Sequence, residues 1–197
     1  MKKSLISLIC ALTILGLFLT GVAWGKKKVN LTERDKDLVV IETSLGKIVI
    51  ALFPNAAPKH CQQIKTLVKE GFYDGTLFHR VIPDFVIQGG DPLTKTPNKN
   101  LWGSGSSKLP NIPAEFNALS HTKGRVAAAR AQDVNSANCQ FYICVGNPTF
   151  LDGKYTVFGE VVEGMPVAEE ISKVPRDGMD RPLKNIVMKK VYLSPAK

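Results

Sequence analysis

The stretch Phe78-His79-Arg80-Val81-Ile82-Pro83-Asp84-Phe85-Val86-Ile87-Gln88-Gly89-Gly90-Asp91 is the most informative part of this chain. It contains two short runs of β-branched and aromatic residues, at 77–81 and 85–88, on either side of Pro83. Such runs are typical of strands, and a proline between them interrupts strand pairing. The stretch therefore predicts two β-strands separated by a proline bend.

Further runs of this kind lie along the rest of the chain, so the fold is predicted to be mainly β. Two segments have the spacing of helices instead, one between Pro58 and Gly71 and a shorter one at 164–171. An open sheet of eight strands would leave unpaired edges, whereas closure removes them and lets the helices bury their apolar faces. We therefore predict a closed eight-stranded antiparallel β-barrel capped by two α-helices. The other strands are expected at 38–42, 47–52, 125–129, 140–145, 156–161 and 186–193.

The first 25 residues form a separate N-terminal segment. Lys2 and Lys3 are followed by a run without charges at 4–25, in which Ala23 and Gly25 are small residues just before Lys26. This order is typical of a secretory signal peptide. It predicts an exported protein, with the periplasm as the favoured compartment. The alternative is an uncleaved membrane anchor, because about 20 apolar residues can span a bilayer.

Removal of this segment would leave 172 of the 197 residues, the size of one domain. We expect a polar linker at 26–37, one domain at 38–193 and a C-terminal tail at 194–197. The formal charge of +9 would fall to +7 with the loss of Lys2 and Lys3. With 44% hydrophobic residues the chain can bury a core, which excludes a disordered or collagen-like polymer.

The cysteines and histidines give no sign of a cofactor. Cleavage would leave Cys61, Cys139 and Cys144, an odd number without a Cys-x-x-Cys pair. A disulfide framework is therefore not expected, although export would permit one bridge. The three histidines are scattered without zinc spacing. We expect buried thiols, no metal and no cofactor.

Three blocks of the sequence resemble one protein family. The stretch 78–91 resembles the cyclophilin family of peptidyl-prolyl cis-trans isomerases in its Phe-His-Arg start, its proline bend and its Gln-Gly-Gly-Asp end. Residues 128–143 and 150–159 are similar to the central and closing segments of that family. The resemblance covers about residues 38–193. It implies the barrel fold, rotamase activity on X-Pro bonds, and proline-containing peptides and unfolded exported proteins as partners.

Arg80 is the residue whose chemistry suits that reaction. On alternate strand positions Arg80 shares a face with Ile82, and Gln88 shares one with Val86. An unpaired guanidinium in a partly dry wall is a directed donor that stays protonated. Donation to the prolyl nitrogen would favour the twisted amide over the planar one. The structural alternative for Arg80 is a surface cation paired with an acid.

The resemblance also implies roles for individual residues, with Arg80 as the catalytic group. Gln88, the backbone of Arg130, and the Tyr155 hydroxyl would contact the peptide chain. Ala129 would form the floor of a neighbouring subsite, and Gln140 would also bind substrate. A hydrophobic pocket for the substrate proline would be lined by Phe85, Val86, Tyr142, Phe150 and Leu151. We expect the other apolar side chains of these blocks, those of Phe141, Val157 and Phe158, in the core.

Several positions depart from the common form of the family. Tyr142 stands in place of phenylalanine, so its hydroxyl must find a partner at the base of the pocket. Phe150 replaces the tryptophan of many eukaryotic members, and Tyr155 replaces their histidine. In sensitive members the indole N–H at the position of Phe150 bonds to cyclosporin, so weak cyclosporin binding is expected here. His79 faces away from Arg80 and is expected to be a hydrogen-bonded structural histidine.

The excursion at 91–117 is too long for a simple connector, and such loops tend to border binding sites. Its part at 93–113 follows the family only loosely, which makes it a candidate for partner selection.

Two other functions stay open. The same groove would serve a binding module or holdase for unfolded chains, and turnover of a short Xaa-Pro peptide separates the two. The positive charge would suit an anionic partner. However, Lys and Arg are scattered along the chain apart from the run at 26–28, so we expect no binding of nucleic acid. Membrane contact is expected only if the N-terminal segment stays uncleaved. We expect a monomer.

Overall fold

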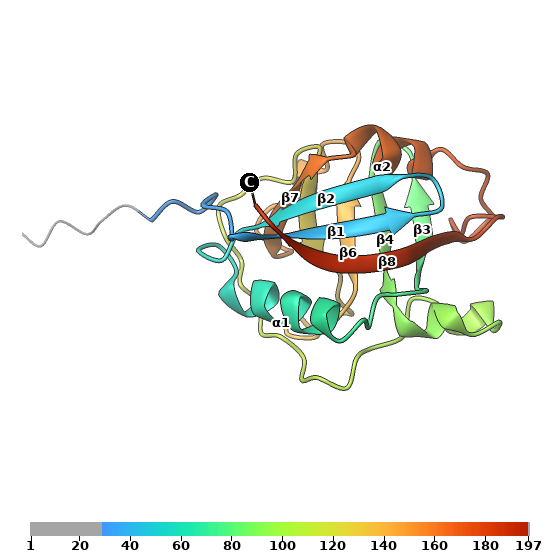
Figure 1. Ribbon diagram of the computed structural model, residues 1–197, viewed down its shortest axis with the longest axis horizontal. Coiled ribbons are helices and arrows are strands. Elements are labelled where there is room, and N and C mark those ends of the chain that lie inside the picture. The colour runs from blue at the N-terminus through green and yellow to red at the C-terminus, as the bar shows by residue number, and fades with distance from the viewer. Residues whose placement is uncertain (1–28, 197) are drawn as a thin grey trace, which may run out of the picture.

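The strands of the barrel close on one another in the order β1-β2-β7-β5-β6-β4-β3-β8, and all neighbouring pairs are antiparallel. The computed structural model describes residues 29–196 (Figure 1). The predicted eight-stranded barrel with two α-helices is therefore confirmed. The strands are β1 (Asp37–Thr43), β2 (Lys47–Leu52), β3 (Leu77–Ile82), β4 (Val86–Asp91), β5 (Arg125–Ala128), β6 (Phe141–Cys144), β7 (Val157–Glu163) and β8 (Ile186–Pro195).

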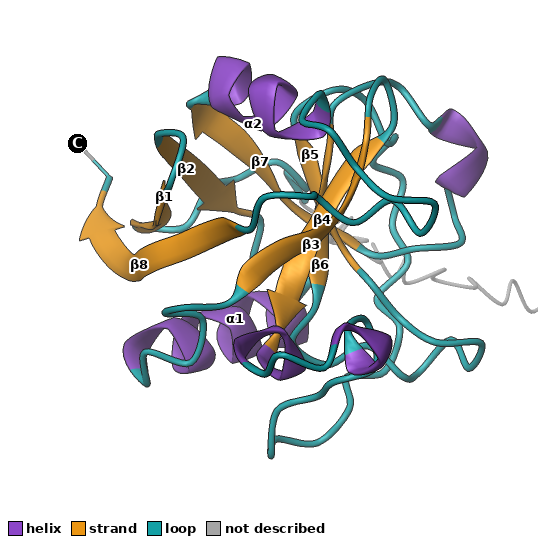
Figure 2. Cartoon of the chain, turned by 90° about the vertical axis from the view of Figure 1, so that its right-hand side faces the viewer, coloured by secondary structure: helices purple, strands orange, loops and turns teal. Residues whose placement is uncertain are grey.

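The two helices, α1 (Pro58–Lys69) and α2 (Met165–Ser172), lie over opposite ends of the barrel (Figure 2). Pro58 stands in the first turn of α1, where its missing N–H is not needed. Just beyond the last turn, Gly71 takes a φ of 65°, a value that suits glycine. The face of α1 that carries Cys61, Ile64 and Leu67 is buried against the barrel. Both helices therefore begin and end close to where the sequence predicted.

The ends of the domain differ by a few residues from the prediction. Asp37, assigned to the linker, is the first residue of β1, and Ser194 and Pro195, assigned to the tail, belong to β8. The Lys65 ammonium of α1 lies 2.9 Å from a carboxylate oxygen of Asp35, just before β1, and 2.8 Å from one of Asp37, the first residue of β1. This ion pair fastens the end of the predicted linker to α1. The signal peptide predicted at 1–25 lies outside the described residues.

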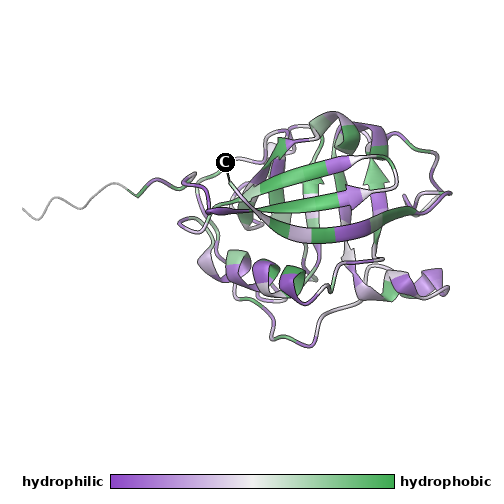
Figure 3. Ribbon diagram, viewed as in Figure 1, coloured by the Kyte–Doolittle hydropathy of each residue, from purple (hydrophilic) through white to green (hydrophobic). Residues whose placement is uncertain are grey.

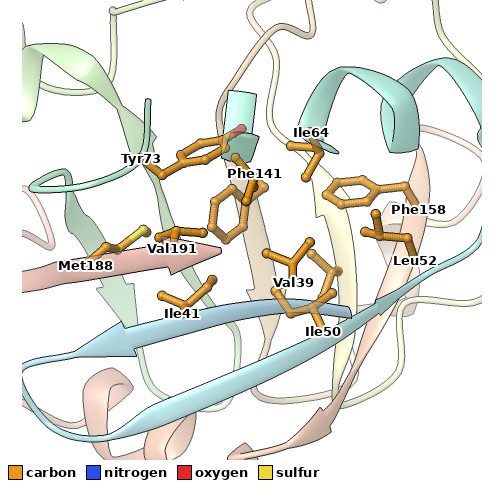
Figure 4. Close-up of a pocket in the computed structure, with 12 residues that line it drawn as sticks. Val39, Ile41, Ile50, Leu52, Ile64, Tyr73, Phe141, Phe158, Met188 and Val191 are labelled. Carbon is orange, nitrogen blue, oxygen red and sulfur yellow. The ribbon is translucent and has the colours of Figure 1, made fainter. Parts of the chain in front are cut away.

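The interior of the barrel is filled by apolar side chains that point toward one another, among them Val39, Ile50 and Phe158 (Figure 4). In Figure 3 the strands are mostly hydrophobic, whereas α1 carries hydrophilic and hydrophobic residues in alternation. The space left inside is about 10 Å³, barely the room that one water needs. A ligand site must therefore lie on the outside of the barrel. Phe141 and Phe158 are buried in this core, as predicted.

The three described cysteines, Cys61, Cys139 and Cys144, are free and buried. Burial raises the pKa of each thiol to about 12, so all three stay protonated at neutral pH. Cys144 is fully buried and acts as a small apolar residue. Within residues 29–196, no group of histidine, cysteine and carboxylate side chains has the arrangement of a metal site. No helix in the same range combines the length and the apolar character needed to cross a bilayer.

Candidate active site

A second, smaller apolar cluster lies on the outer face of β4, β5, β6 and β7. Its buried members are Val86, Ala127, Tyr142, Cys144 and Val157, each 5% exposed or less. Side chains at alternate positions of these strands therefore point to opposite sides of the barrel wall. One set packs in the barrel interior, and the other set packs in this outer cluster. Val157, expected in the core, is fully buried but belongs to the outer cluster.

A concave pocket of about 180 Å³ opens over this cluster and brings together nine of the eleven predicted site residues. One wall comes from β3, β4 and the bend between them, and the other from β6 and the segments at 129–130 and 151–155. Sequence blocks more than 40 residues apart therefore meet in one depression. The nine residues are Arg80, Phe85, Val86, Gln88, Ala129, Arg130, Tyr142, Leu151 and Tyr155.

The other two predicted residues border this pocket. The ring of Phe150, in the short helix η3 (Thr149–Leu151), is 64% exposed and stacks on Phe85 with centroids 5.7 Å apart. The Gln140 side chain accepts a hydrogen bond from Gln88 at 3.1 Å and donates to the carbonyl of Gly105 at 2.8 Å. Gln140 lines an adjacent depression of about 350 Å³ that shares Gln88, Ala129 and Arg130 with the first.

The long loop predicted to border the site does so. Gly103, Ser104, Gly105 and Ser106 line the depression beside Gln88. Their position is held by Gln140, which donates to the carbonyls of Gly103 and Gly105 at 3.0 and 2.8 Å. A substrate that extends past the first pocket would therefore meet the backbone of this loop.

The sequence suggested an unpaired guanidinium at Arg80, but the structure places a carboxylate near it. The Nε of Arg80 lies 3.8 Å from a carboxylate oxygen of Asp180. The other oxygen of this carboxylate lies closer to Arg176, at 3.2 Å from its Nε. Asp180 belongs to a loop that folds back on β3, where its carbonyl accepts a hydrogen bond from the Val81 N–H at 2.8 Å. The Arg80 side chain is 41% exposed and its charged end lies 5.8 Å from the centroid of the Phe85 ring. A partner at this distance, exposed to water, attracts the guanidinium only weakly.

The side chain of Arg130 is held in place by contacts on both sides of this wall. Its guanidinium lies 4.5 Å from the centroid of the Tyr155 ring and donates to the carbonyls of Ala131 and Lys154 at 2.9 and 3.0 Å. The side chain therefore points along the loop and joins the two segments that form this wall.

The comparisons with known proteins agree with this geometry. Residues 38–193 match the family described as cyclophilin type peptidyl-prolyl cis-trans isomerase/CLD. The chain belongs to the cyclophilin family. A probable peptidyl-prolyl cis-trans isomerase of Brucella suis is 43% identical over 142 residues, 70% of this chain and 72% of that protein. A peptidyl-prolyl cis-trans isomerase of Schizosaccharomyces pombe is 41% identical over 158 residues, 79% of this chain and 98% of that protein.

Solved structures of cyclophilins have the same fold. A cyclophilin type isomerase of Cryptosporidium parvum, crystallised in the presence of the dipeptide Ala-Pro, superposes with a TM-score of 0.74 at 27% identity, over 81% of this chain and 99% of its own. The cyclophilin AquaCyp293 of Hirschia baltica gives a TM-score of 0.68 at 25% identity, over 79% and 73% of the two chains. This cyclophilin is therefore an enzyme, a peptidyl-prolyl cis-trans isomerase.

Sequence reasoning missed the partner of the Tyr142 hydroxyl in this cyclophilin. The oxygen lies 3.0 Å from Nε2 of His121, whose Nδ1 lies 2.8 Å from a carboxylate oxygen of Asp152. Asp152 lies in a turn, and His121 is fully buried. The signal was present in the sequence, since a tyrosine in an apolar pocket needs a hydrogen-bond partner.

His79 is buried, as expected for a structural residue, with 4% of its surface exposed. Its Nδ1 has no hydrogen-bond partner among the described residues. A bulge in the pairing of β3 with β4 between Phe78 and Arg80 sets His79 apart from the regular ladder. Burial, opposed by the nearby Asp91 carboxylate, lowers the pKa of His79 overall.

We expect the free energy of unfolding of this cyclophilin to decrease as the pH falls from about 6.5 to 5. Burial lowers the pKa of His60 and of His79 in the folded chain below the 6.5 of the unfolded one. Below pH 6.5 the unfolded chain therefore binds more protons than the folded one, which favours unfolding. Carboxylates whose pKa is lowered contribute to the pH dependence of the free energy of unfolding only below about pH 4. Urea unfolding between pH 6.5 and 5 measures how steeply the free energy of unfolding changes with pH. His60→Gln should reduce this pH dependence. A free energy of unfolding that does not change with pH in this range would contradict the lowered pKa of the two histidines.

Proposed function

We propose that this cyclophilin accelerates the rotation of X-Pro bonds in polypeptides exported from the cytoplasm, assists their folding, and uses Arg80 as its catalytic group. The observation that carries the site assignment is a single pocket in which the guanidinium faces aromatic and aliphatic side chains. Isomerisation of a short Xaa-Pro peptide, with Arg80 present and replaced, tests this assignment.

The resistance of an X-Pro bond to rotation explains why one donor is sufficient. The barrier of ~18–20 kcal/mol exists because the nitrogen lone pair is delocalised into the carbonyl. In the twisted state the lone pair returns to the nitrogen, which then accepts a hydrogen bond. A guanidinium N–H placed there is bound more tightly in the transition state than in the planar ground state. No nucleophile and no proton transfer is needed.

The surroundings of Arg80 support this role. Within residues 29–196 the guanidinium donates no hydrogen bond, so its N–H groups are available to a substrate. Val86 and Tyr142 are at most 5% exposed and form an apolar floor that contacts the proline ring. A planar amide has more charge separation than a twisted one, so a pocket with little water also favours the twisted state.

The path of the peptide follows the two connected depressions. The proline ring occupies the pocket beneath Phe85 and Leu151, and the residue before it lies toward Ala129 and Gln140. The Cryptosporidium parvum relative was crystallised in the presence of Ala-Pro, which supports proline-containing peptides as substrates of this chain as well. Binding needs one copy of the chain, in line with the expectation of a monomer.

Export is the part of the proposal that rests on residues 1–25 alone. Expressed at full length in a bacterium, the protein is expected outside the cytoplasm with a mature N-terminus at or near Lys26, because small residues precede this position. Cell fractionation and N-terminal sequencing measure both properties. A full-length species retained in the membrane would instead support the uncleaved anchor.

A further inference from the structure

A chain of hydrogen bonds lies directly beneath the proposed proline pocket. It runs from the Asp152 carboxylate through the His121 ring to the Tyr142 hydroxyl, with heavy-atom distances of 2.8 and 3.0 Å. His121 is fully buried and its ring stacks on that of Tyr142, with centroids 6.1 Å apart and an angle of 20° between the planes. These residues come from β6 and from two loops, so the chain of bonds joins three separate segments.

The direction of each bond follows from the chemistry of its ends. The Asp152 carboxylate accepts from the Ser120 hydroxyl at 2.6 Å and from the backbone N–H of His121 at 2.7 Å. Burial would raise the pKa of Asp152, but these bonds and the one from the His121 ring lower it overall, so the carboxylate is ionised. An ionised carboxylate only accepts, so Nδ1 of His121 must carry a proton.

The direction of the other bond depends on the number of protons on the imidazole. Burial holds the pKa of Tyr142 well above its usual range, so the hydroxyl keeps its proton. When Nδ1 carries the one ring proton, Nε2 is an acceptor. In that form Tyr142 donates to His121, and its O–H bond points away from the proline pocket.

We propose that His121 is a positioning residue that fixes the floor and the rim of the proline pocket by accepting from Tyr142 and donating to Asp152. The proposal rests on the placement of the proline pocket given above. The floor is the Tyr142 ring, and the rim is Leu151, which directly precedes Asp152 in the chain. Within the described residues, His121 is the single hydrogen-bond partner of the Tyr142 hydroxyl.

Loss of His121 would therefore change the pocket in a specific manner. A buried hydroxyl without a partner needs a water molecule. To reach water, the Tyr142 ring would have to turn toward the pocket that it lines, which would change the floor that receives the proline. Arg80 lies on β3 and forms no hydrogen bond or ion pair with the three residues within the described part of the chain, so we expect a larger effect on KM than on kcat.

The protonation of His121 is the first test, and it is independent of activity. Nitrogen-15 NMR of the labelled protein distinguishes the two neutral forms of each of its three histidines, and the loss of one set of signals in His121→Leu assigns them. We expect a proton on Nδ1 and none on Nε2, whatever the role of the pocket. A proton on Nε2 alone would overturn the proposal.

The second test uses the kinetics of Xaa-Pro isomerisation. We expect His121→Leu to raise KM about tenfold with kcat changed less than about twofold, the effect of one unpartnered polar group. Adding Tyr142→Phe to the same chain should recover most of the KM, because no hydroxyl then remains without a partner. An unchanged KM in the single variant, or a double variant no better than the single one, would overturn the proposal.

Two further variants keep the result interpretable. His60 is a second buried histidine, which lies on α1 and away from the pocket. Its Nδ1 lies 2.6 Å from a carboxylate oxygen of Glu115. His60→Leu should lower the melting temperature without raising KM, which separates a general loss of stability from the effect at the pocket. If His121→Leu does not fold, Asp152→Ala replaces it, since that side chain is 37% exposed. It should raise KM several-fold and shift the His121 proton toward Nε2, and failure of both changes would overturn the proposal.

Discussion

Replacing Arg80 by alanine is expected to lower kcat/KM for an Xaa-Pro peptide by about a hundredfold or more. The variant removes the donor that we propose bonds to the prolyl nitrogen, and a preorganised donor to a transition state contributes about 2.7–4 kcal/mol. Stability should change little, because the side chain is 41% exposed and its carboxylate partner is 3.8 Å away. Steady-state or exchange kinetics on a short peptide, with urea unfolding in parallel, measure both quantities.

Two variants serve as controls for this result. Arg80→Lys should recover little activity, because an ammonium lacks the planar fork of the guanidinium. Arg176 is a matched arginine that bonds to the same Asp180 but does not line the pocket, and Arg176→Ala should keep nearly normal turnover. Turnover of Arg80→Ala close to that of the unmodified chain would remove the basis of the proposed mechanism.

The fold was predictable because its signals are local. Each strand shows as a short run of apolar residues, and α1 shows as Pro58, Gly71 and an apolar face between them. Closure into a barrel follows from the number of strands, since edges that stay unpaired are costly. Neighbours such as β7 and β2 are far apart in the sequence, so the order of the strands around the barrel was not predicted.

The pairing of charged and polar groups was not predictable in the same way. Asp180 reaches Arg80 from a loop 100 residues further along the chain, and nothing in its local sequence indicates this contact. His60 was assigned no partner, yet its ring bonds to Glu115 at 2.6 Å. These contacts depend on how loops fold over the barrel, which hydrophobic patterning does not determine.

The candidate site lies between these two cases. The family resemblance selected nine residues that the structure brings into one pocket, because the strands that carry most of them are fixed by the barrel. His121 stands in the loop at 119–124, which has neither helical nor strand periodicity. The unusual Tyr142 predicted that some partner must exist, but only the three-dimensional arrangement identifies which one.

Cyclosporin is expected to inhibit this cyclophilin weakly, and the exposed ring of Phe150 gives the reason. In sensitive members of the family an indole N–H at this position donates to the drug. Here the ring is 64% exposed, stacks on Phe85 at 5.7 Å and has no N–H to offer. A ligand carbonyl covered at this rim would stay without a partner, at a cost of about 1–3 kcal/mol.

The reverse substitution turns this into a measurement. Phe150→Trp should increase the affinity for cyclosporin by roughly 5- to 150-fold, the equivalent of one recovered hydrogen bond. Phe150→Leu is the matched control, because it removes the aromatic ring without adding a donor and should gain nothing. Inhibition of peptide isomerisation by increasing drug concentrations gives the affinity of each variant. The ring of Phe150 stacks on Phe85, which lines the pocket, so an indole in its place would stand at the rim of the pocket. Equal affinities for the tryptophan variant and the unmodified chain would therefore mean that the ligand does not pass over this rim.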